Sequence, residues 1–205
     1  MKRGMKRGTK RGPRGAFAGL AALACLVLGA CARPEPLPIL GQVPDFQLTS
    51  QTGRPFDSRS LEGHAWVADF IYTNCPGPCP MMSSQMSRVQ SGTAGFGGAA
   101  GAAGVEMVSF TVDPARDTPE VLAAYARHFR AQEARWHFLT GPQASLNTLG
   151  LNVFHLNGVD GSLEHSTRFA LVDGRRRIRG TYLTSEDGFL GRLLGDIRRL
   201  EREKA

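Results

Sequence analysis

The sequence predicts an α/β fold, in which a central mixed β-sheet is flanked by helices and carries an N-terminal β-hairpin. The nearly continuous apolar run at residues 65–72 is typical of a strand that is buried on both faces, and residues 105–112 are predicted to form a second strand. Each of these strands is followed by a segment whose apolar residues recur at helical spacing. A hairpin pattern at 169–183 and an amphipathic segment from 189 to 200 complete the chain.

The remaining elements are predicted from short local patterns. Thr118-Pro119-Glu120 is typical of a helix start, because Thr caps the first turn and Pro is favoured at the first helical position. Asp173-Gly174 is typical of the tight turn of a hairpin. In chain order we expect a hairpin at 45–56, a helical turn at 58–63, a strand at 65–72, a helix from 80 to 89, a Gly/Ala-rich loop at 91–104, a strand at 105–112, a helix from 119 to 129, a strand at 136–139, a short helix at 143–150, a hairpin at 169–183 and a C-terminal helix.

This succession of elements is that of a thioredoxin-like fold, with two cysteines directly after the first central strand. We expect one such domain over residues 42–205. Residues 31–41, which contain Pro34, Pro36 and Pro38, are predicted to be an extended tether.

Residues 1–30 are typical of a secretion signal. Seven basic residues within positions 1–14 precede an apolar run at 16–30, which is short for a membrane span. Leu28-Gly29-Ala30-Cys31 resembles a bacterial lipobox, which implies a lipoprotein signal peptide and a lipid on Cys31. The alternative is an uncleaved signal anchor. In both cases we expect a bacterial cell-envelope protein that is tethered to a membrane, with its domain outside the cytoplasm.

The net charge of +7 gives no reason to expect a nucleic-acid partner. The chain has 25 Lys and Arg against 18 Asp and Glu, and seven of the basic residues lie in the leader. Without the leader, the two signs of charge balance, so a basic surface for nucleic acid is not predicted.

Two of the four cysteines are candidates for chemistry. Cys25 lies in the apolar leader and Cys31 is the predicted lipid site. Cys75 and Cys79 remain, and a lone pair in an oxidising compartment is a disulfide, a redox couple or a pair of metal ligands.

The turn that carries this pair is conformationally restricted. Pro76, Pro78 and Pro80 fix their own φ and steer the residues before them away from helical geometry. We expect the helix to begin at Pro80, with Cys79 at the positive end of its dipole. The pKa of the Cys79 thiol is therefore predicted to fall, and both thiols are expected to be presented at the surface.

The spacing of the two thiols fits neither common oxidoreductase pattern. Thioredoxin-type reductases have two residues between their cysteines, whereas Cys75 and Cys79 have three. Peroxiredoxins have a Thr three residues before the reactive Cys, where this chain has Tyr72.

A metal site requires a further ligand, and His165 is the best-placed histidine. It immediately precedes the predicted strand at 169, and in a thioredoxin-like fold the loop before that strand lies against the cysteine turn. Two thiolates and one imidazole suit copper, whereas a structural zinc site normally has a fourth protein ligand. Three methionines, Met81, Met82 and Met86, are further soft ligands in principle, but their helical spacing favours packing in the core.

The chain resembles the Sco/SenC family of copper chaperones for cytochrome c oxidase assembly. Residues 75–80 (CPGPCP) match the family's C-P-x-x-C-P, and residues 112–119 (VDPARDTP) match its V-D-P-x-R-D-T-P. Glu164-His165-Ser166 lies where the family has its ligand histidine, usually after Asp. The resemblance covers roughly residues 42–200, with Glu164 and the Gly/Ala-rich loop at 91–104 as departures.

The resemblance implies a copper site and a partner. Cys75, Cys79 and His165 are then the ligands of one copper ion per chain, with Asp113 close to the site but not bound to the metal. The two cysteines also form a redox disulfide. The implied activity is delivery of copper to the copper centre of cytochrome c oxidase subunit II, or to another copper acceptor.

Two other functions stay open at this point. One is a thiol–disulfide reductase that acts on cysteines of the oxidase subunit and makes no use of His165. The other is a structural disulfide in a binding module without redox activity.

Overall fold

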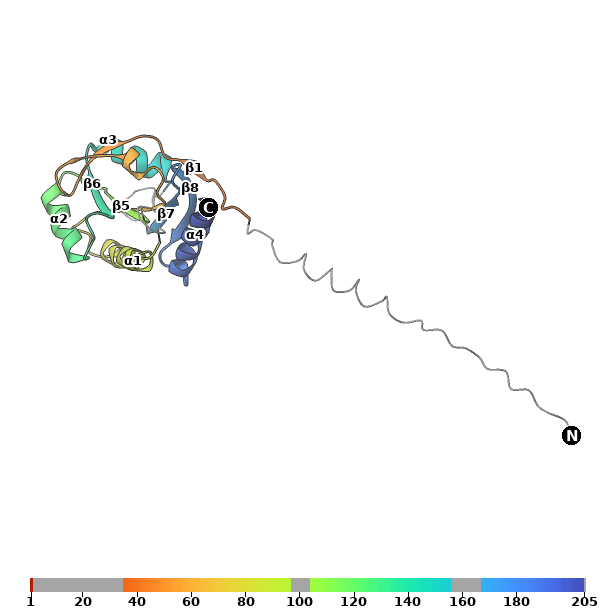
Figure 1. Cartoon of the computed structure of the whole chain (residues 1–205). Helices are drawn as coiled ribbons and strands as arrows, with labels where there is room; N and C mark the ends of the chain where they lie inside the picture. The colour runs from red at the N-terminus through yellow and green to blue at the C-terminus, as the bar shows by residue number, and fades with distance from the viewer. Residues whose placement is uncertain (2–34, 97–103, 156–166, 205) are drawn as a thin grey trace. The chain divides into compact units, whose positions relative to one another are not determined.

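An eight-stranded mixed β-sheet forms the centre of the part of the chain that the structure describes (Figure 1). The computed structural model describes residues 1, 35–96, 104–155 and 167–204. Its contacts separate residues 1–35 from a unit that spans residues 36–205, and the fold described below belongs to that second unit. The predicted class, an α/β fold with a mixed central sheet flanked by helices, is confirmed.

The sheet consists of parallel central strands and antiparallel outer strands. β4, β5 and β6 run parallel to one another, and every other neighbouring pair is antiparallel. The predicted N-terminal hairpin is β2 and β3, which joins the same sheet by pairing with β6. From one edge to the other, the strands are β1 (Gly41–Gln42), β8 (Arg177–Leu183), β7 (Arg168–Val172), β4 (Trp66–Ile71), β5 (Glu106–Thr111), β6 (Trp136–Thr140), β2 (Gln47–Ser50) and β3 (Pro55–Asp57).

β4 is the strand that delivers the cysteines. All six of its residues are buried, as its apolar run predicts. Because side chains alternate along a strand, its odd-numbered residues face the layer that contains Val67 and Ile71, and its even-numbered residues face the layer that contains Trp66 and Phe70. Ile71 pairs with Thr111 of β5, so these two parallel strands end at the same edge of the sheet. The cysteine turn, residues 72–79, leaves the sheet at that edge.

Helices cover both faces of the sheet. Figure 1 shows α1 (Pro78–Gly92) and α4 (Phe189–Lys204) on one side and α3 (Gln143–Asn147) on the other. α2 (Pro119–His128) adds Leu122 to the same buried cluster as α1 and α4. The opposite cluster receives residues from the 3₁₀ turn η1 (Ser58–Leu61), from α3 and from the π-helical turn η2 (Thr148–Val153).

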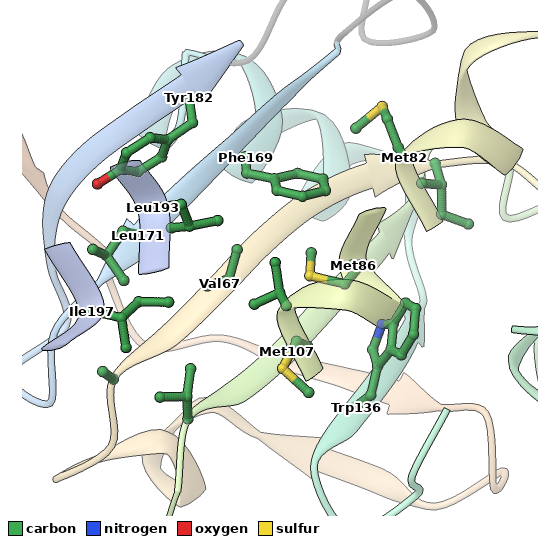
Figure 2. Packing of buried hydrophobic residues seen from close by; sticks show 14 of the residues in the cluster. Val67, Met82, Met86, Met107, Trp136, Phe169, Leu171, Tyr182, Leu193 and Ile197 are labelled. Atoms are coloured by element: carbon green, nitrogen blue, oxygen red, sulfur yellow. The ribbon is translucent and has the colours of Figure 1, made fainter. Parts of the chain in front are cut away.

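The core beneath α1 and α4 is large and apolar. Figure 2 shows Met86 of α1 beside Trp136 of β6 and Met107 of β5, with Leu193 and Ile197 of α4 further along the sheet. Each large apolar side chain that is fully buried in this way contributes about 1.5–3 kcal/mol relative to an exposed one. This cluster also contains Cys75 and Cys79.

The N-terminal segment of the domain, residues 37–42, packs on the sheet, although the sequence places most of it in the tether. Leu37 is buried, and its carbonyl oxygen accepts a hydrogen bond from Arg179 Nη2 at 2.7 Å. Gly41 and Gln42 form β1, which pairs with β8. The domain supplies hydrogen-bond partners for these backbone groups, and residues 37–42 are therefore held on the sheet.

Candidate functional site

Two backbone N–H groups of the cysteine turn donate hydrogen bonds to acceptors within the turn. Cys75 N donates to Tyr72 O at 3.3 Å, and Cys79 N donates to Cys75 Sγ at 3.4 Å. α1 begins at Pro78. The predicted start at Pro80 is therefore wrong by two residues, because the first N–H groups of a helix need no acceptor within it and the first turn accommodates both prolines.

Both thiols are free and buried. Cys75 is 6% exposed and Cys79 is 2% exposed. The expected presentation of the thiols at the surface is thus wrong, because both side chains pack into the apolar cluster beneath α1. The exposed part of the turn is the rim around them, formed by Asn74, Pro76, Gly77 and Pro80.

The pKa values of the two thiols are shifted in opposite directions. Burial raises the pKa of the Cys79 thiol far above its ordinary value, and the hydrogen bond with Cys75 raises it further. The predicted fall of this pKa is wrong, because the loss of hydration outweighs the helix dipole. Burial also raises the pKa of Cys75, but hydrogen bonds from the Cys79 side chain and from the backbone N–H groups of Cys79 and Gly77 bring it below its ordinary value. Cys75 is therefore the more acidic thiol of the pair.

Asp117 fastens the cysteine turn to the end of β5. Its carboxylate accepts hydrogen bonds from Thr73 N at 3.2 Å, from Thr73 Oγ1 at 2.6 Å and from Thr111 Oγ1 at 2.5 Å. Asp117 is only 1% exposed. No role for Asp117 is predicted from the sequence, although this residue lies within the V-D-P-x-R-D-T-P match, which is the signal that points to it.

Asp113, which the resemblance places close to copper, shapes the same loop. Its carboxylate accepts a hydrogen bond from Arg116 Nη1 at 3.2 Å, and its carbonyl oxygen accepts one from Asp117 N at 2.9 Å. The turn formed in this way directs Asp117 back toward Thr73. A role for Asp113 beside the metal stays a prediction.

The methionines of α1 divide into two kinds. Met82 and Met86 are fully buried, which confirms that they pack in the core. Met81 is 48% exposed, so core packing is wrong for this residue. It lies two positions after Cys79 in the first turns of α1.

Some predicted site residues lie outside the described residues. These are His165, the predicted third copper ligand, and Cys31, the predicted lipid site. Within the described ranges, no group of three or more His, Cys, Asp and Glu side chains is arranged to hold a metal ion. None of the helices described there has both the length and the apolar character needed to cross a bilayer.

The fold and the site together define a thioredoxin-like dithiol protein. Cys75 follows β4 of the mixed sheet, and Cys79 lies in the first turn of α1, the helix that covers the sheet. One thiol is acidic, and the other is deeply buried and weakly acidic.

Comparison with known proteins identifies the family within this class. The SCO1/SenC family model matches residues 40–200. The chain belongs to the SCO1/SenC family, and the predicted resemblance is confirmed.

Solved structures of similar proteins support this assignment. A SCO1/SenC family lipoprotein from Bacillus anthracis is 29% identical, with a TM-score of 0.69 over 81% of this chain and 99% of that one. BsSco, a member of the Sco family of cytochrome c oxidase assembly proteins in which a disulfide switch was identified, is 28% identical, with a TM-score of 0.68 over 81% and 97%. ScoI from Bradyrhizobium japonicum, solved with copper bound, has the same fold at 24% identity, with a TM-score of 0.59 over 77% and 98%.

Proposed function

We propose that this chain is a membrane-tethered metallochaperone that delivers copper to the copper centre of cytochrome c oxidase subunit II. One copper ion, its cargo, is held by reduced Cys75 and Cys79 together with His165. The observation that carries the proposal is the pair of free thiols, linked by the Cys79 N to Cys75 Sγ contact, at the start of α1 in a SCO1/SenC chain. Two thiolates and an imidazole form a soft ligand set that suits copper.

The register of the sheet supports the assignment of His165 as the third ligand. β7 is antiparallel to β4, with Val172 opposite Trp66 and Ala170 opposite Ala68. β7 therefore begins next to the end of β4, at the edge where the cysteine turn leaves the sheet. His165 precedes the first residue of β7, Arg168, by three positions in the sequence.

The oxidation state of the two cysteines controls copper binding in this proposal. Copper requires both sulfurs as thiolates, so closing the Cys75–Cys79 disulfide removes two of the three ligands. The disulfide switch identified in BsSco supports such a control.

Release of copper proceeds by exchange of ligands with the acceptor. Cys75 lies between the exposed residues Asn74 and Pro76, so an acceptor thiolate approaches the metal from that side. Cys79 is less exposed and anchors the ion from beneath. Replacing the three ligands one at a time avoids a free ion at any stage.

A lipid on Cys31 holds the protein at the membrane in the bacterial cell envelope. The lipobox-like sequence before Cys31 supports this part of the proposal, as does the lipoprotein nature of the Bacillus anthracis relative. Mass analysis of the mature N-terminus tests it directly, and an N-terminus that retains Met1 contradicts it.

The ligand set is tested by the copper content of the reduced protein after anaerobic reconstitution with Cu(I). We expect about one copper ion per chain for the wild type, and loss of stoichiometric binding in Cys75→Ser, Cys79→Ser and His165→Ala. His128→Ala is the matched control, because His128 is exposed at the end of α2. Wild-type copper content in His165→Ala would contradict the ligand assignment.

Delivery is tested by mixing the copper-loaded protein with the copper-free soluble domain of oxidase subunit II. We expect the optical spectrum of the acceptor's copper centre to appear while the donor loses its metal. Transfer that is no faster than from a copper–glutathione complex would contradict delivery.

A thiol–disulfide reductase is the second candidate, because the two thiols have opposite pKa shifts. An acidic Cys75 is suited to attack a disulfide, and a buried Cys79 is suited to resolve the mixed disulfide. A reductase tolerates His165→Ala and loses turnover in Cys79→Ser, whereas a copper carrier is impaired by both changes. Turnover of a disulfide-containing peptide from the oxidase subunit distinguishes the reductase from the copper carrier.

A further inference from the structure

Ile39 and Leu40 form an exposed apolar pair on a fixed backbone. Ile39 is 60% exposed and Leu40 is 55% exposed. Leu40 N donates to Ile178 O at 2.8 Å, and Arg179 Nε donates to Pro38 O at 3.0 Å. The backbone on both sides of the pair is therefore held by β8. The domain presents these two side chains to solvent in a defined place and leaves their apolar surface uncovered, which is unfavourable in water.

The pair differs from the other exposed apolar side chains. Beyond Met1, the large apolar side chains that are exposed among the described residues are those of Ile39, Leu40, Met81 and Val121. Met81 lies in the first turns of α1 and Val121 in the first turn of α2, and the apolar residue that follows each of them is buried. Apolar residues that are exposed singly are ordinary, whereas two adjacent ones form a patch that a contact can cover.

A short stretch of chain separates this pair from the predicted membrane anchor. Leu37 follows Cys31 by six positions in the sequence. A fully extended chain covers at most about 3.6 Å per residue, so an anchor at Cys31 keeps Leu37 within about 22 Å of the bilayer surface. Ile39 and Leu40 follow directly. A contact between the pair and the membrane is then intramolecular, and a small number of weak contacts suffices for it.

Exposed cations lie in the same part of the domain. Gln42 Nε2 donates to the carbonyl oxygen of Arg175 at 3.0 Å, which places the exposed Arg175 beside β1. The guanidinium group of Arg175 forms no ion pair with the described residues, whereas its neighbours in the β7–β8 turn are paired with acids. On α4, Glu203 accepts a hydrogen bond from Leu37 N at 3.0 Å, and the exposed Arg202 precedes Glu203. Both cations therefore lie close to the segment that carries the apolar pair.

A cavity of about 350 Å³ lies between the β7–β8 turn and the end of α4. Its lining includes Arg175, Arg177, Arg179, Asp173 and Glu203. Arg177 and Arg179 bind Asp173, and Arg179 also binds Glu203, so the acids of the lining are already paired. Arg175 is the cation of the lining that stays available. Such a cavity suits the phosphate group of a lipid headgroup, because arginine binds phosphate oxygens through charged hydrogen bonds.

We propose that Ile39, Leu40, Arg175 and Arg202, which we call the membrane corner, rest on the phospholipid bilayer to which the chain is tethered. Ile39 and Leu40 enter the boundary between headgroups and acyl chains, and the two guanidinium groups bind headgroup phosphates. Anionic lipid favours the contact, although the exposed Glu35 offsets one of the two positive charges. The inference rests on the membrane tether of the proposed function and adds to it the orientation of the domain.

The membrane corner and the cysteine turn lie at opposite ends of the central strands. Leu40 binds Ile178, which pairs with Val172 of β7, and Val172 pairs with Trp66, the first residue of β4. Ile71, the last residue of β4, lies five residues further along the strand, or roughly 17 Å. A domain that is docked through its membrane corner therefore presents the cysteine turn away from the bilayer, where an acceptor in the aqueous phase reaches it.

Tryptophan fluorescence in vesicles with brominated acyl chains tests the contact. The full chain is produced in bacteria, so that its leader is processed as in the cell, and is reconstituted into vesicles of phosphatidylglycerol and phosphatidylcholine. The native Trp66 and Trp136 are 0% exposed and provide a constant background. We expect bromine close to the headgroups to lower the emission of the added tryptophan in Leu40→Trp by about twofold or more. Met81→Trp, at the cysteine end of the domain, is the matched control and should keep its emission.

Reversal of one charge tests the headgroup contact. In the Leu40→Trp background, Arg175→Glu should lower the ratio of docked to undocked domain by about fivefold or more in vesicles that contain phosphatidylglycerol. The change should be much smaller in phosphatidylcholine alone. Arg127→Glu, at an exposed position of α2, is the control and should leave the quenching unchanged. Ile39→Trp is a second probe of the same contact and should be quenched like Leu40→Trp.

Several results would overturn the docking. One is equal emission of Leu40→Trp and of Ile39→Trp in brominated and unbrominated vesicles, and a blue-shifted emission in that case would show that protein covers the pair. Another is equal quenching of Leu40→Trp and Met81→Trp. An effect of Arg175→Glu no larger than that of Arg127→Glu would contradict the headgroup contact.

Flotation of the wild-type chain with the vesicles in a density gradient measures the tether separately. A chain that floats with the vesicles but shows no quenching at positions 39 and 40 contradicts the docking alone. A chain that does not float contradicts the tether of the proposed function as well as the docking.

Discussion

Thr73 Oγ1 donates a hydrogen bond of 2.6 Å to Asp117, and this contact joins the cysteine turn to the loop that follows β5. Asp117 belongs to the V-D-P-x-R-D-T-P motif, and Thr73 lies two residues before the C-P-x-x-C-P motif. The V-D-P-x-R-D-T-P motif therefore supplies the carboxylate that holds the cysteine turn in place. Thr111, at the end of β5, completes the arrangement by donating to the same carboxylate.

Removal of the Thr73 hydroxyl should destabilise the protein. Thr73→Val leaves the buried Asp117 carboxylate with fewer donors, which typically costs about 1–3 kcal/mol. Urea denaturation of the reduced, metal-free protein measures the change. Thr181→Val, at an exposed position of β8, is the control and should stay within about 0.5 kcal/mol of the wild type. Equal stabilities of the two variants would show that the Thr73–Asp117 contact contributes little.

Asp69 should make the stability of the protein depend on pH. Its pKa is raised in the folded state from 3.8 to about 7, so the folded protein holds this proton more tightly than the unfolded chain does. The stabilisation that results is complete below the unfolded pKa and is lost as the pH rises through the folded pKa. Between about pH 4 and about pH 8, the free energy of unfolding of the wild type should therefore fall by roughly 3–4 kcal/mol relative to Asp69→Asn, which does not titrate. Urea denaturation of both proteins across this range measures the difference, and parallel pH profiles would contradict the raised pKa.

The two cysteines should differ strongly in reactivity. At neutral pH a small alkylating agent such as iodoacetamide should modify Cys75, because its pKa is lowered, and should leave Cys79 untouched. In denaturant both should react. Peptide mass mapping after short labelling checks this, with Cys79→Ser as the control for assignment. Preferential labelling of Cys79 in the folded protein would show that the helix dipole, rather than burial, sets its acidity.

The difference in acidity between Cys75 and Cys79 is the feature of the site that the sequence did not predict correctly. The buried strands and the thioredoxin-like order follow from local apolar patterns, and the structure confirms them. The acidity of Cys79 depends on how deeply its sulfur lies under α1, which is a result of packing between distant segments. The link from Asp117 to Thr73 spans 44 residues, so no local pattern could distinguish Asp117 from Asp113 as the residue that holds the turn.

The methionines of α1 provide a test of the core. Met86 is fully buried, whereas Met81 is largely exposed, so the same change should have very different effects at the two positions. Met86→Ala should lower the free energy of unfolding by about 2–5 kcal/mol through lost burial and a residual cavity. Met81→Ala should change it by less than about 0.5 kcal/mol. Thermal or urea denaturation of both variants measures this, and a small effect at Met86 would mean that the core collapses readily around the lost side chain.

The attachment of residues 37–42 to the sheet has a mechanical consequence. Arg179 binds the carbonyl oxygens of Leu37 and Pro38, and β1 pairs with the beginning of β8. These bonds lie at the end of the sheet where β4 begins, whereas the thiols follow the end of β4. A force that arrives along the chain from its N-terminal side is therefore borne by the sheet edge and by Arg179. Such a force reorients the whole domain and does not change the distance between the sulfurs of Cys75 and Cys79.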